Sequence, residues 1–268
     1  MKFKTFVINM KKNPDRLAFM SDELGKLGIP FVVQEGIDGQ THDFSDVYDE
    51  KFAIEKNGAP LTAGEKGCAL SHRTIWQTIV SEKLDCALIL EDDVELAPTF
   101  KTALDEALDD RESGNTDWEY LAFNYPSPGI KYIRLWLFML SEKLAKEQSP
   151  RKYLALPWYM LKFVGMAAMS IFEGARNAFY KRTDRNAALL FFRPVYLAGC
   201  YLITAEGARK LLALSEKLAY TADRIQNVAR VKSSLHIRYH VPLLAWQRRD
   251  RFQSNMYSDK RYDFKRYG

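Results

Sequence analysis

The stretch that decides the fold is CALILEDDVE, which occupies residues 86–95. Residues 86–90 are all apolar, and Glu91, Asp92 and Asp93 follow them without a break. A short, wholly apolar run is typical of a central strand in a parallel sheet, because such a strand is buried on both faces. Ligands of open α/β sheets bind beyond the carboxyl ends of the strands, which is where these acids stand. The stretch therefore predicts an α/β fold with an acidic site at one edge of its sheet.

The acids themselves indicate a cation. Four carboxylates within residues 91–95 repel one another unless a positive charge neutralises them. Strand alternation places Glu91 and Asp93 on one side and Asp92 on the other. Mg²⁺ and Mn²⁺ take oxygen ligands and leave positions open for substrate phosphates. We therefore expect a divalent cation here, and the alternative is that the acids only cap the following helix and lie in water.

Alternating strands and helices extend outward from this stretch, as in an open α/β sheet. Asn13 is expected to cap the first helix and Gly28 to end it, and Thr62 with Glu65 has the spacing of a capping box. The predicted order is strand 3–10, helix 14–27, strand 30–33, an irregular segment 36–60, helix 63–83, strand 86–90, helix 98–110, strand 118–123, strand 195–204, helix 205–218 and an apolar run 241–246.

Composition excludes several classes of protein. The chain has 268 residues, 47% of them hydrophobic and 27% charged, which suits a folded protein and not a disordered one. A net charge of +5 is too small to indicate nucleic acid as a partner. The three cysteines form no CxxC pair, which argues against a disulfide framework and a cysteine zinc site. Residues 1–14 do not have the pattern of a signal peptide, so the expected compartment is the cytoplasm.

The positive charge is concentrated in residues 126–193, where twelve basic residues face four acidic ones. Residues 154–172 within it are almost entirely apolar, but Pro157 and Lys162 interrupt the run and argue against a transmembrane helix. Basic charge combined with large aromatic groups suits contact with anionic lipid. The alternative is a helical subdomain whose aromatic side chains form a core of their own.

A second motif, LTAGEKGCALSH, covers residues 61–72. Glu65, Cys68 and His72 are three or four residues apart and share one face of the predicted helix. Gly64 and Gly67, near the helix start, would let another backbone or a ligand phosphate approach closely. A capped helix with His72 as a satisfied core group explains the same pattern equally well.

Together the two motifs, with the spacing LTxxExxCxxSH and the later ILEDDV, resemble glycosyltransferase family 25, the lipopolysaccharide glycosyltransferases. Further pieces match in the family's order, although the proline that the family has two residues before its late aspartate is absent. These pieces are Ile8-Asn9-Met10, Asp15-Arg16, Asp38-Gly39, residues 199–204 with Gly207-Ala208, and Ala222-Asp223-Arg224. The resemblance covers residues 1–125 and 195–256, whereas 126–193 has no counterpart in it.

The resemblance implies a GT-A type, Rossmann-like nucleotide-sugar transferase fold. Residues 1–125 would form its nucleotide-sugar-binding part, and 194–268 the rest of the catalytic domain with a basic tail. Residues 126–193 would be a helical, basic and aromatic insertion that contacts the membrane or grips the acceptor. The implied reaction is transfer of a hexose, galactose first and glucose next, from a UDP-sugar to a lipopolysaccharide or lipooligosaccharide. For this family we expect inversion and a β-linkage.

The resemblance also suggests roles for single residues. Asp93 and Glu91 would hold Mn²⁺ or Mg²⁺, with His240 as a late third ligand, although a lone histidine is often a structural group. Asp223 would be the general base, unless it is the N-cap of a helix beginning at Arg224. Asp92 would be free to hold the ribose. The expected donor-binding residues are Asn9, Arg16, Asp38, Glu65, Gly67 and Asp92.

A lipid-linked oligosaccharide acceptor would place the protein at the cytoplasmic face of the inner membrane, in peripheral contact with anionic lipid through residues 126–193. Two other functions fit parts of the sequence. One is a metal-dependent phosphatase or nuclease that uses Glu91, Asp92 and Asp93. The other is a non-catalytic membrane adaptor built on a degenerate transferase fold, which the missing proline before Asp223 leaves open.

Overall fold

The computed structural model describes residues 1–125, 187–189, 197–248 and 251–252, together with isolated helical positions between 157 and 176. The chain divides into two compact units, residues 1–125 with 187–263 and residues 126–186 with 264–268. Most of the predicted insertion, residues 126–193, lies outside the described residues. Its last part differs from the prediction, because residues 187–189 form a strand of the main sheet and not a helix. None of the helices in the described part of the chain is long and apolar enough to cross a membrane.

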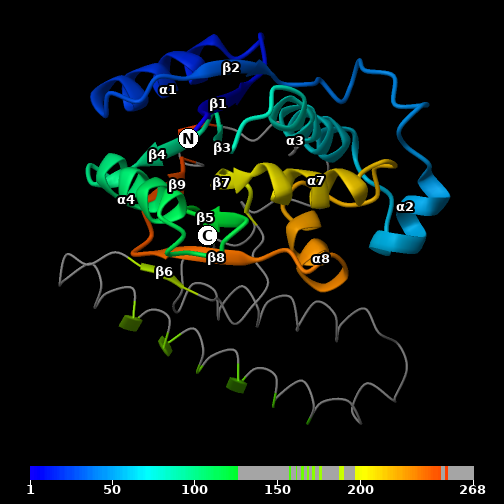
Figure 1. Ribbon diagram of the computed structural model, residues 1–268. Coiled ribbons are helices and arrows are strands. Elements are labelled where there is room, and N and C mark those ends of the chain that lie inside the picture. The colour runs from blue at the N-terminus through cyan, green and yellow to red at the C-terminus, as the bar shows by residue number, and fades with distance from the viewer. Residues whose placement is uncertain are drawn as a thin grey trace. The chain divides into compact units, whose positions relative to one another are not determined.

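The core of the first unit is a seven-stranded sheet with the order β2-β1-β3-β7-β5-β8-β6 (Figure 1). Its strands are β1 (Phe3–Asn9), β2 (Val32–Glu35), β3 (Cys86–Glu91), β5 (Tyr120–Ala122), β6 (Ala187–Leu189), β7 (Cys200–Thr204) and β8 (Ile237–Val241). Strand β1 is parallel to both β2 and β3, and β5 is parallel to β8. Strands β7 and β6 run antiparallel to their neighbours. The fold is thus a mixed, mostly parallel, Rossmann-like α/β sheet.

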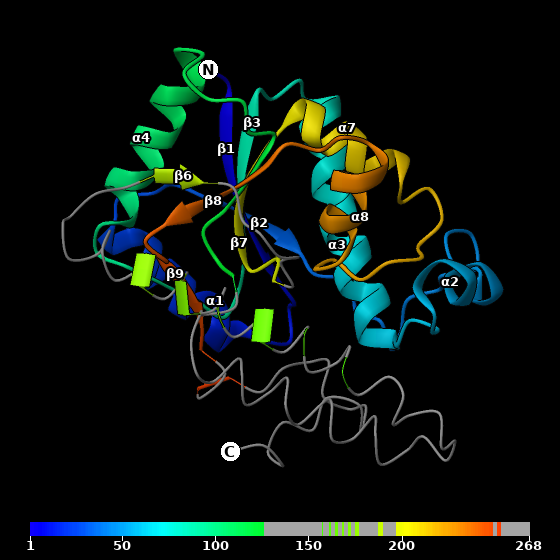
Figure 2. The same ribbon diagram turned by 90° about the horizontal axis from the view of Figure 1, so that it is seen from below.

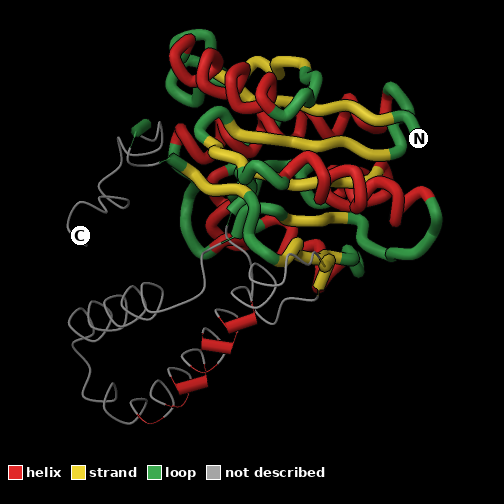
Figure 3. Tube along the Cα trace, turned by 90° about the vertical axis from the view of Figure 1, so that its left-hand side faces the viewer, coloured by secondary structure: helices red, strands yellow, loops and turns green. Residues whose placement is uncertain are grey.

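Helices cover both faces of this sheet (Figures 2 and 3). They are α1 (Pro14–Lys26), α3 (Ala63–Ser81), α4 (Phe100–Glu112), α7 (Ala205–Ala213) and α8 (Ile225–Lys232), and a short helix α2 (Glu50–Asn57) lies in the loop before α3. The side chains of β3 alternate between two cores. Ile89 packs with Trp76 of α3 on one face, whereas Leu88 packs with Met20 of α1 and Phe100 of α4 on the other.

A second, two-stranded sheet follows the acid run directly. Strand β4 (Val94–Leu96) pairs antiparallel with β9 (Ala245–Gln247), so that Val94 lies opposite Gln247. The predicted apolar run 241–246 thus divides between the end of β8 and the start of β9. This pairing brings a late segment of the chain next to the acids at the end of β3.

Several local predictions are confirmed. Strand β3, helix α1 and helix α3 lie where the patterns placed them, and Thr62 and Glu65 form both hydrogen bonds of the capping box. Gly28 takes a φ of +64° after α1. One cap was wrong, because Asn13 occupies the N-cap position of α1 but its side chain makes no capping hydrogen bond. Residues 36–60 are also less irregular than expected, since they contain α2.

Candidate functional site

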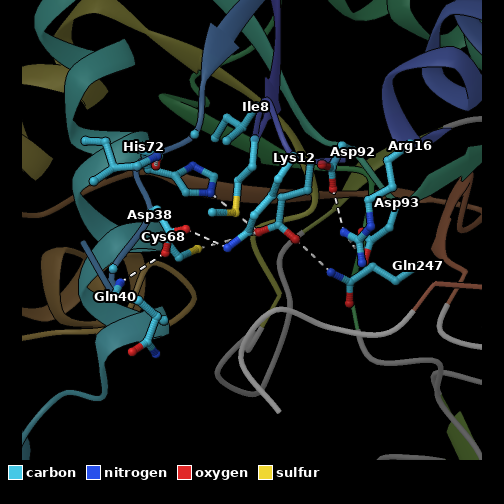
Figure 4. A pocket seen from close by; sticks show the side chains of 17 residues that line it. Ile8, Lys12, Arg16, Asp38, Gln40, Cys68, His72, Asp92, Asp93 and Gln247 are labelled. Atoms are coloured by element: carbon cyan, nitrogen blue, oxygen red, sulfur yellow. Dashed lines mark hydrogen bonds and ion pairs between the residues drawn. The ribbon is translucent and has the colours of Figure 1, made fainter. Parts of the chain in front are cut away.

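A cavity opens at the carboxyl ends of β1 and β3 (Figure 4). It is the place where the sequence predicted a ligand, and it brings together Arg16, Asp38, Glu91, Asp92 and Asp93. The lining residues are Ile8, Met10, Lys12, Arg16, Gly36, Ile37, Asp38, Gly39, Gln40, Gly64, Cys68, Ser71, His72, Glu91, Asp92, Asp93 and Gln247. They come from the ends of β1 and β3 and the residues just after them, from α1, the loop after β2, the first half of α3 and the end of β9.

Asp92 is held by two side chains from the first strand and helix. Arg16 Nη1 donates to its Oδ1 at 2.7 Å, and Asn9 Nδ2 donates to its Oδ2 at 2.8 Å. Burial raises the pKa of Asp92, while Arg16 and Asn9 lower it. Asp92 is therefore already engaged by two side chains, while its contact with a ribose stays a prediction, since it lines the cavity and each carboxylate oxygen can accept a second hydrogen bond. Arg16, an expected donor-binding residue, lines the cavity and pairs with Asp92, which directly follows β3.

Glu91 points the other way, toward α3. Its Oε1 lies 3.5 Å from His72 Nε2 and 4.0 Å from Cys68 Sγ, and its Oε2 accepts from Gln247 Nε2 at 2.8 Å. Among the described residues, Cys68, His72 and Glu91 form a group whose ligand atoms all lie within 4.8 Å of one another. Glu91 and Asp92 thus point in opposite directions, as strand alternation predicts. Asp93 does not share the side of Glu91 as expected, because its Oδ2 lies 3.9 Å from Arg16 Nη1, on the side of Asp92.

Negative charge is concentrated on the α3 side of the site. Burial raises the pKa of the Cys68 thiol well above its usual value, and Glu91, Asp223, Asp93 and Glu65 raise it further. Four carboxylates therefore act on one thiol. Carboxylate oxygens are the ligands that Mn²⁺ and Mg²⁺ prefer, so the donor set and its charge fit a hard divalent cation.

Two glycines let the loop after β2 pack directly on the start of α3. A Cβ at Gly39 would lie 1.7 Å from Ala63 O, and one at Gly67 would lie 2.4 Å from Ile37 O. Gly67 thus admits another backbone, which is one of the two explanations that the sequence left open, and it does not line the cavity. Glu65 is also absent from the lining, because its side chain caps α3.

Lys12 is a cavity residue that the sequence analysis did not single out. Its Nζ lies 2.6 Å from Asp38 Oδ2, so a lysine ammonium group lies just beyond the carboxyl end of β1 (Figure 4). This ion pair, together with the Gln40 backbone amide, lowers the pKa of Asp38. The position of Lys12 just beyond an apolar strand was an available signal. No pattern in the sequence indicated Gln247, because it is the pairing of β4 with β9 that brings it to the site.

Asp223 lies in the turn before α8 and does not cap that helix. The helix begins at Ile225, and its N-cap position, Arg224, makes no side-chain capping bond. Asp223 Oδ1 accepts from Thr221 Oγ1 at 2.5 Å instead. Burial raises the pKa of Asp223, and Glu91 and Glu65 raise it further, although Thr221 opposes them. Asp223 is thus electrostatically coupled to the acids of the site without lining the cavity itself.

His240 is not brought to the acids. It lies on β8, which β7 and β5 separate from β3, and its buried ring packs 5.1 Å from that of Phe123. Its Nδ1 is 2.8 Å from Pro242 O, and burial lowers its pKa to about 4. It belongs neither to the cavity lining nor to the group around Glu91. The structure therefore does not support His240 as a third ligand beside Glu91 and Asp93.

Comparison with known proteins adds family context to this geometry. A family model described as "Glycosyltransferase family 25 (LPS biosynthesis protein)" matches residues 2–226. Procollagen galactosyltransferase 1-B of Xenopus laevis is 33% identical over 124 residues, which are 44% of this chain and 20% of that protein. Procollagen galactosyltransferase 2 of Homo sapiens is 32% identical over 124 residues, 43% of this chain and 20% of that protein.

One of the similar proteins is named as inactive. The inactive glycosyltransferase 25 family member 3 of Homo sapiens is 30% identical over 124 residues, 44% of this chain and 21% of that protein. The chain spans about a fifth of the length of the curated relatives it matches. Among solved structures, mannose-1-phosphate geranyltransferase from Thermus thermophilus aligns with a TM-score of 0.33 and 11% identity, covering 91% of this chain and 75% of that one.

Proposed function

Because the chain belongs to glycosyltransferase family 25, we propose that it transfers a hexose from a UDP-sugar to a saccharide acceptor. One observation carries the proposal. The cavity at the ends of β1 and β3 combines the acids Glu91, Asp92 and Asp93 with the cations Lys12 and Arg16. A nucleotide diphosphate needs a site of this kind, in which positive charge and metal-binding carboxylates meet at the carboxyl edge of an α/β sheet.

Asp93 and Glu91 are the residues that would hold Mn²⁺ or Mg²⁺. A bound cation would act as a Lewis acid and offset the charge that develops on the diphosphate leaving group. Lys12 lines the same cavity, and its ammonium group would also offset the charge on the diphosphate. Asp92 then has a different task, because its contacts with Arg16 and Asn9 fix the end of β3 relative to β1 and α1.

Asp223 is our candidate for the general base. It would take the proton of the acceptor hydroxyl while the acceptor oxygen bonds to the anomeric carbon and the bond to the diphosphate oxygen breaks. A base works best when its pKa is close to the working pH, and burial raises the pKa of Asp223 in that direction. A single displacement of this kind inverts the anomeric centre and gives a β-linkage from an α-linked donor.

Galactose is the favoured hexose, with glucose next, because two of the relatives are named galactosyltransferases. We propose a lipopolysaccharide or lipooligosaccharide as the acceptor, in keeping with the description of the family model. A non-catalytic role is the second candidate, since a human relative of similar identity is named inactive. The complete acid run of this chain favours catalysis over that role.

The donor site can be tested by thermal unfolding with UDP, UDP-galactose, UDP-glucose and UDP-N-acetylglucosamine, each with and without Mn²⁺. A ligand present at about one hundred times its dissociation constant stabilises a protein by about 2.7 kcal/mol. We expect a metal-dependent rise in melting temperature that is largest with UDP-galactose. The variant Asp223→Asn should keep this rise but lose transfer. If no nucleotide shifts the wild-type melting temperature with Mn²⁺ present, the donor site is not the one proposed.

We further propose peripheral contact with an anionic membrane through residues 126–193, in the cytoplasm. The net positive charge of this segment supports it. So do four exposed apolar side chains at helical positions whose spacing places them on one face, namely Leu161, Val164, Ile171 and Phe172. Cationic and apolar groups together are what an interfacial segment needs.

Flotation with liposomes tests this contact. The wild-type chain is expected to float with anionic vesicles at low salt and to be released at high salt, because salt screens the attraction. Phe172→Glu should weaken flotation severalfold. Val231→Glu is the matched control, since Val231 is an exposed apolar residue of α8 outside the segment. Absence of binding to anionic vesicles at low salt would exclude the membrane proposal.

A further inference from the structure

A buried chain of hydrogen bonds lies behind the cavity, and the proposed reaction does not use it. Trp76 Nε1 donates to Tyr201 Oη at 3.0 Å, and the same oxygen lies 2.9 Å from His72 Nδ1. Trp76 and His72 belong to α3 and Tyr201 to β7. The exposed fractions of these three residues are 2%, 0% and 1%, so water does not compete for the bonds.

The direction of the chain follows from its first member. The indole nitrogen of Trp76 can only donate, so the oxygen of Tyr201 accepts from it. The hydroxyl of Tyr201 has one proton, and His72 Nδ1 lies within reach to accept it. Burial raises the pKa of Tyr201 well above its usual value, so that proton is retained. In a neutral imidazole the other nitrogen then carries the hydrogen, which places the proton of His72 on Nε2.

His72 Nε2 faces Glu91 Oε1 at 3.5 Å, and in the described part of the chain it is a buried nitrogen without a hydrogen-bond partner. An N–H group facing a carboxylate is attractive, whereas the lone pair of the opposite tautomer would repel it, and a low local dielectric strengthens both effects. Gln247 holds the other oxygen of Glu91 from the far side. We infer that His72 is a positioning residue, with its tautomer set by Trp76 and Tyr201, that keeps the Glu91 carboxylate aimed into the cavity. The inference rests on the proposed function only in assigning a cation to Glu91.

The same atoms could instead form a metal site of Cys68, His72 and Glu91, which are close enough to share an ion. In that arrangement His72 Nε2 gives up its hydrogen, and Nδ1 carries the proton. The oxygen of Tyr201 would then accept from both Trp76 and His72, and its own proton would lose its acceptor. The Trp76–Tyr201 bond therefore favours the arrangement in which His72 Nε2–H faces Glu91 over direct coordination by His72.

The tautomer can be measured without substrate. The chain has four histidines, so the ring nitrogens of ¹⁵N-labelled protein give a simple spectrum. His240 is an internal reference, because its Nδ1 must donate to the carbonyl of Pro242. We expect hydrogen on Nε2 at His72 and on Nδ1 at His240. Tyr201→Phe should shift the Nδ1 resonance of His72, and Glu91→Gln should shift the Nε2–H resonance of His72. Both variants should leave the His240 resonances unchanged. Hydrogen on Nδ1 at His72 overturns the inference.

Activity supplies the second readout. Loss of a group that orients a metal ligand typically lowers metal affinity about 10- to 100-fold, so His72→Leu should raise the Mn²⁺ concentration for half-maximal transfer by that factor. His72→Gln, which retains an amide N–H in that direction, should recover most of it. Ile79→Val, at another buried position of α3, should leave the Mn²⁺ requirement unchanged.

Three results separate the inference from the proposed function. An unchanged Mn²⁺ requirement in folded His72→Leu overturns the inference. So does loss of the His72 Nε2–H signal on addition of Zn²⁺ alone to the wild-type protein, since this would make His72 a ligand. If the wild-type protein shows no transfer with any donor, the proposed function fails, while the ring-nitrogen spectra of the wild type and of Glu91→Gln still decide whether His72 contacts Glu91 as inferred.

Discussion

Replacing Asp93 by alanine is expected to lower kcat/KM for sugar transfer by about a thousandfold, which is about 4 kcal/mol of transition-state stabilisation. Asp93 lines the cavity one residue after Asp92, and its carboxylate adds to the negative charge acting on Cys68. Loss of this proposed ligand would remove much of the Lewis-acid contribution to the departure of the diphosphate, a contribution worth several kcal/mol. The measurement is steady-state transfer from UDP-galactose in the presence of Mn²⁺.

Glu95→Ala is the matched control, because Glu95 belongs to the same acid run but does not line the cavity. Its carboxylate pairs with Arg248 at 3.2 Å. We expect this variant to keep wild-type kcat/KM. Equal losses in both variants would mean that total charge, and not a metal ligand, controls activity. A non-catalytic chain would give no transfer in any form, and a phosphatase would lose phosphate-ester hydrolysis in the Asp93 variant instead.

The parts of the fold that could be predicted are those that neighbouring residues determine. Residues 86–90 are apolar without interruption, and they form the buried strand β3. Thr62 and Glu65 have the capping-box spacing and make both of its bonds. Helix α2 was missed although its caps were visible in the sequence. Asp49 accepts from the Phe52 amide at its start, and Gly58 takes a φ of +81° at its end. Its weak amphipathic pattern concealed it.

The parts of the site that escaped prediction depend on contacts between distant segments. Gln247 reaches Glu91 only because β9 pairs with β4. The bond from Tyr201 to His72 spans 129 residues, and no local pattern indicates it. Asp92 could be placed on the side of β3 opposite Glu91, but its neighbours Arg16 and Asn9 could not be identified. His240 is the opposite case, a residue that was predicted at the site and does not lie there. The sequence around a lone histidine in a strand does not indicate whether its ring faces a ligand or the core.

Replacing Arg16 by methionine is expected to lower the free energy of unfolding by about 4 kcal/mol at neutral pH. Breaking a buried ion pair from one side costs roughly 3–5 kcal/mol, because the remaining charge is left without its partner. Arg16 is 6% and Asp92 7% exposed, and among the described residues Asn9 is the donor that remains to the Asp92 carboxylate. Denaturant unfolding of both proteins measures the difference. The control is Lys26→Met, which removes an exposed pair with Asp22 and should change nothing measurable.

The deficit of the Arg16 variant should shrink as the pH falls. Burial raises the pKa of Asp92 in the folded protein, and Arg16 is the strongest influence that lowers it. Without Arg16 that pKa rises further above its unfolded value of about 3.9. The folded variant then binds a proton more tightly than the unfolded chain, so acid stabilises the variant relative to the wild type. Unfolding curves from mildly acidic to mildly alkaline pH should therefore converge at the acidic end. Adding Asp92→Leu to Arg16→Met should reduce the pH dependence and recover part of the stability, because the carboxylate that Arg16 contacts at 2.7 Å is gone and the buried Asp93, 3.9 Å from Arg16, is the acid that remains there. A deficit that stays constant with pH would show that Arg16 acts through packing against Phe252 and not through the charge of Asp92.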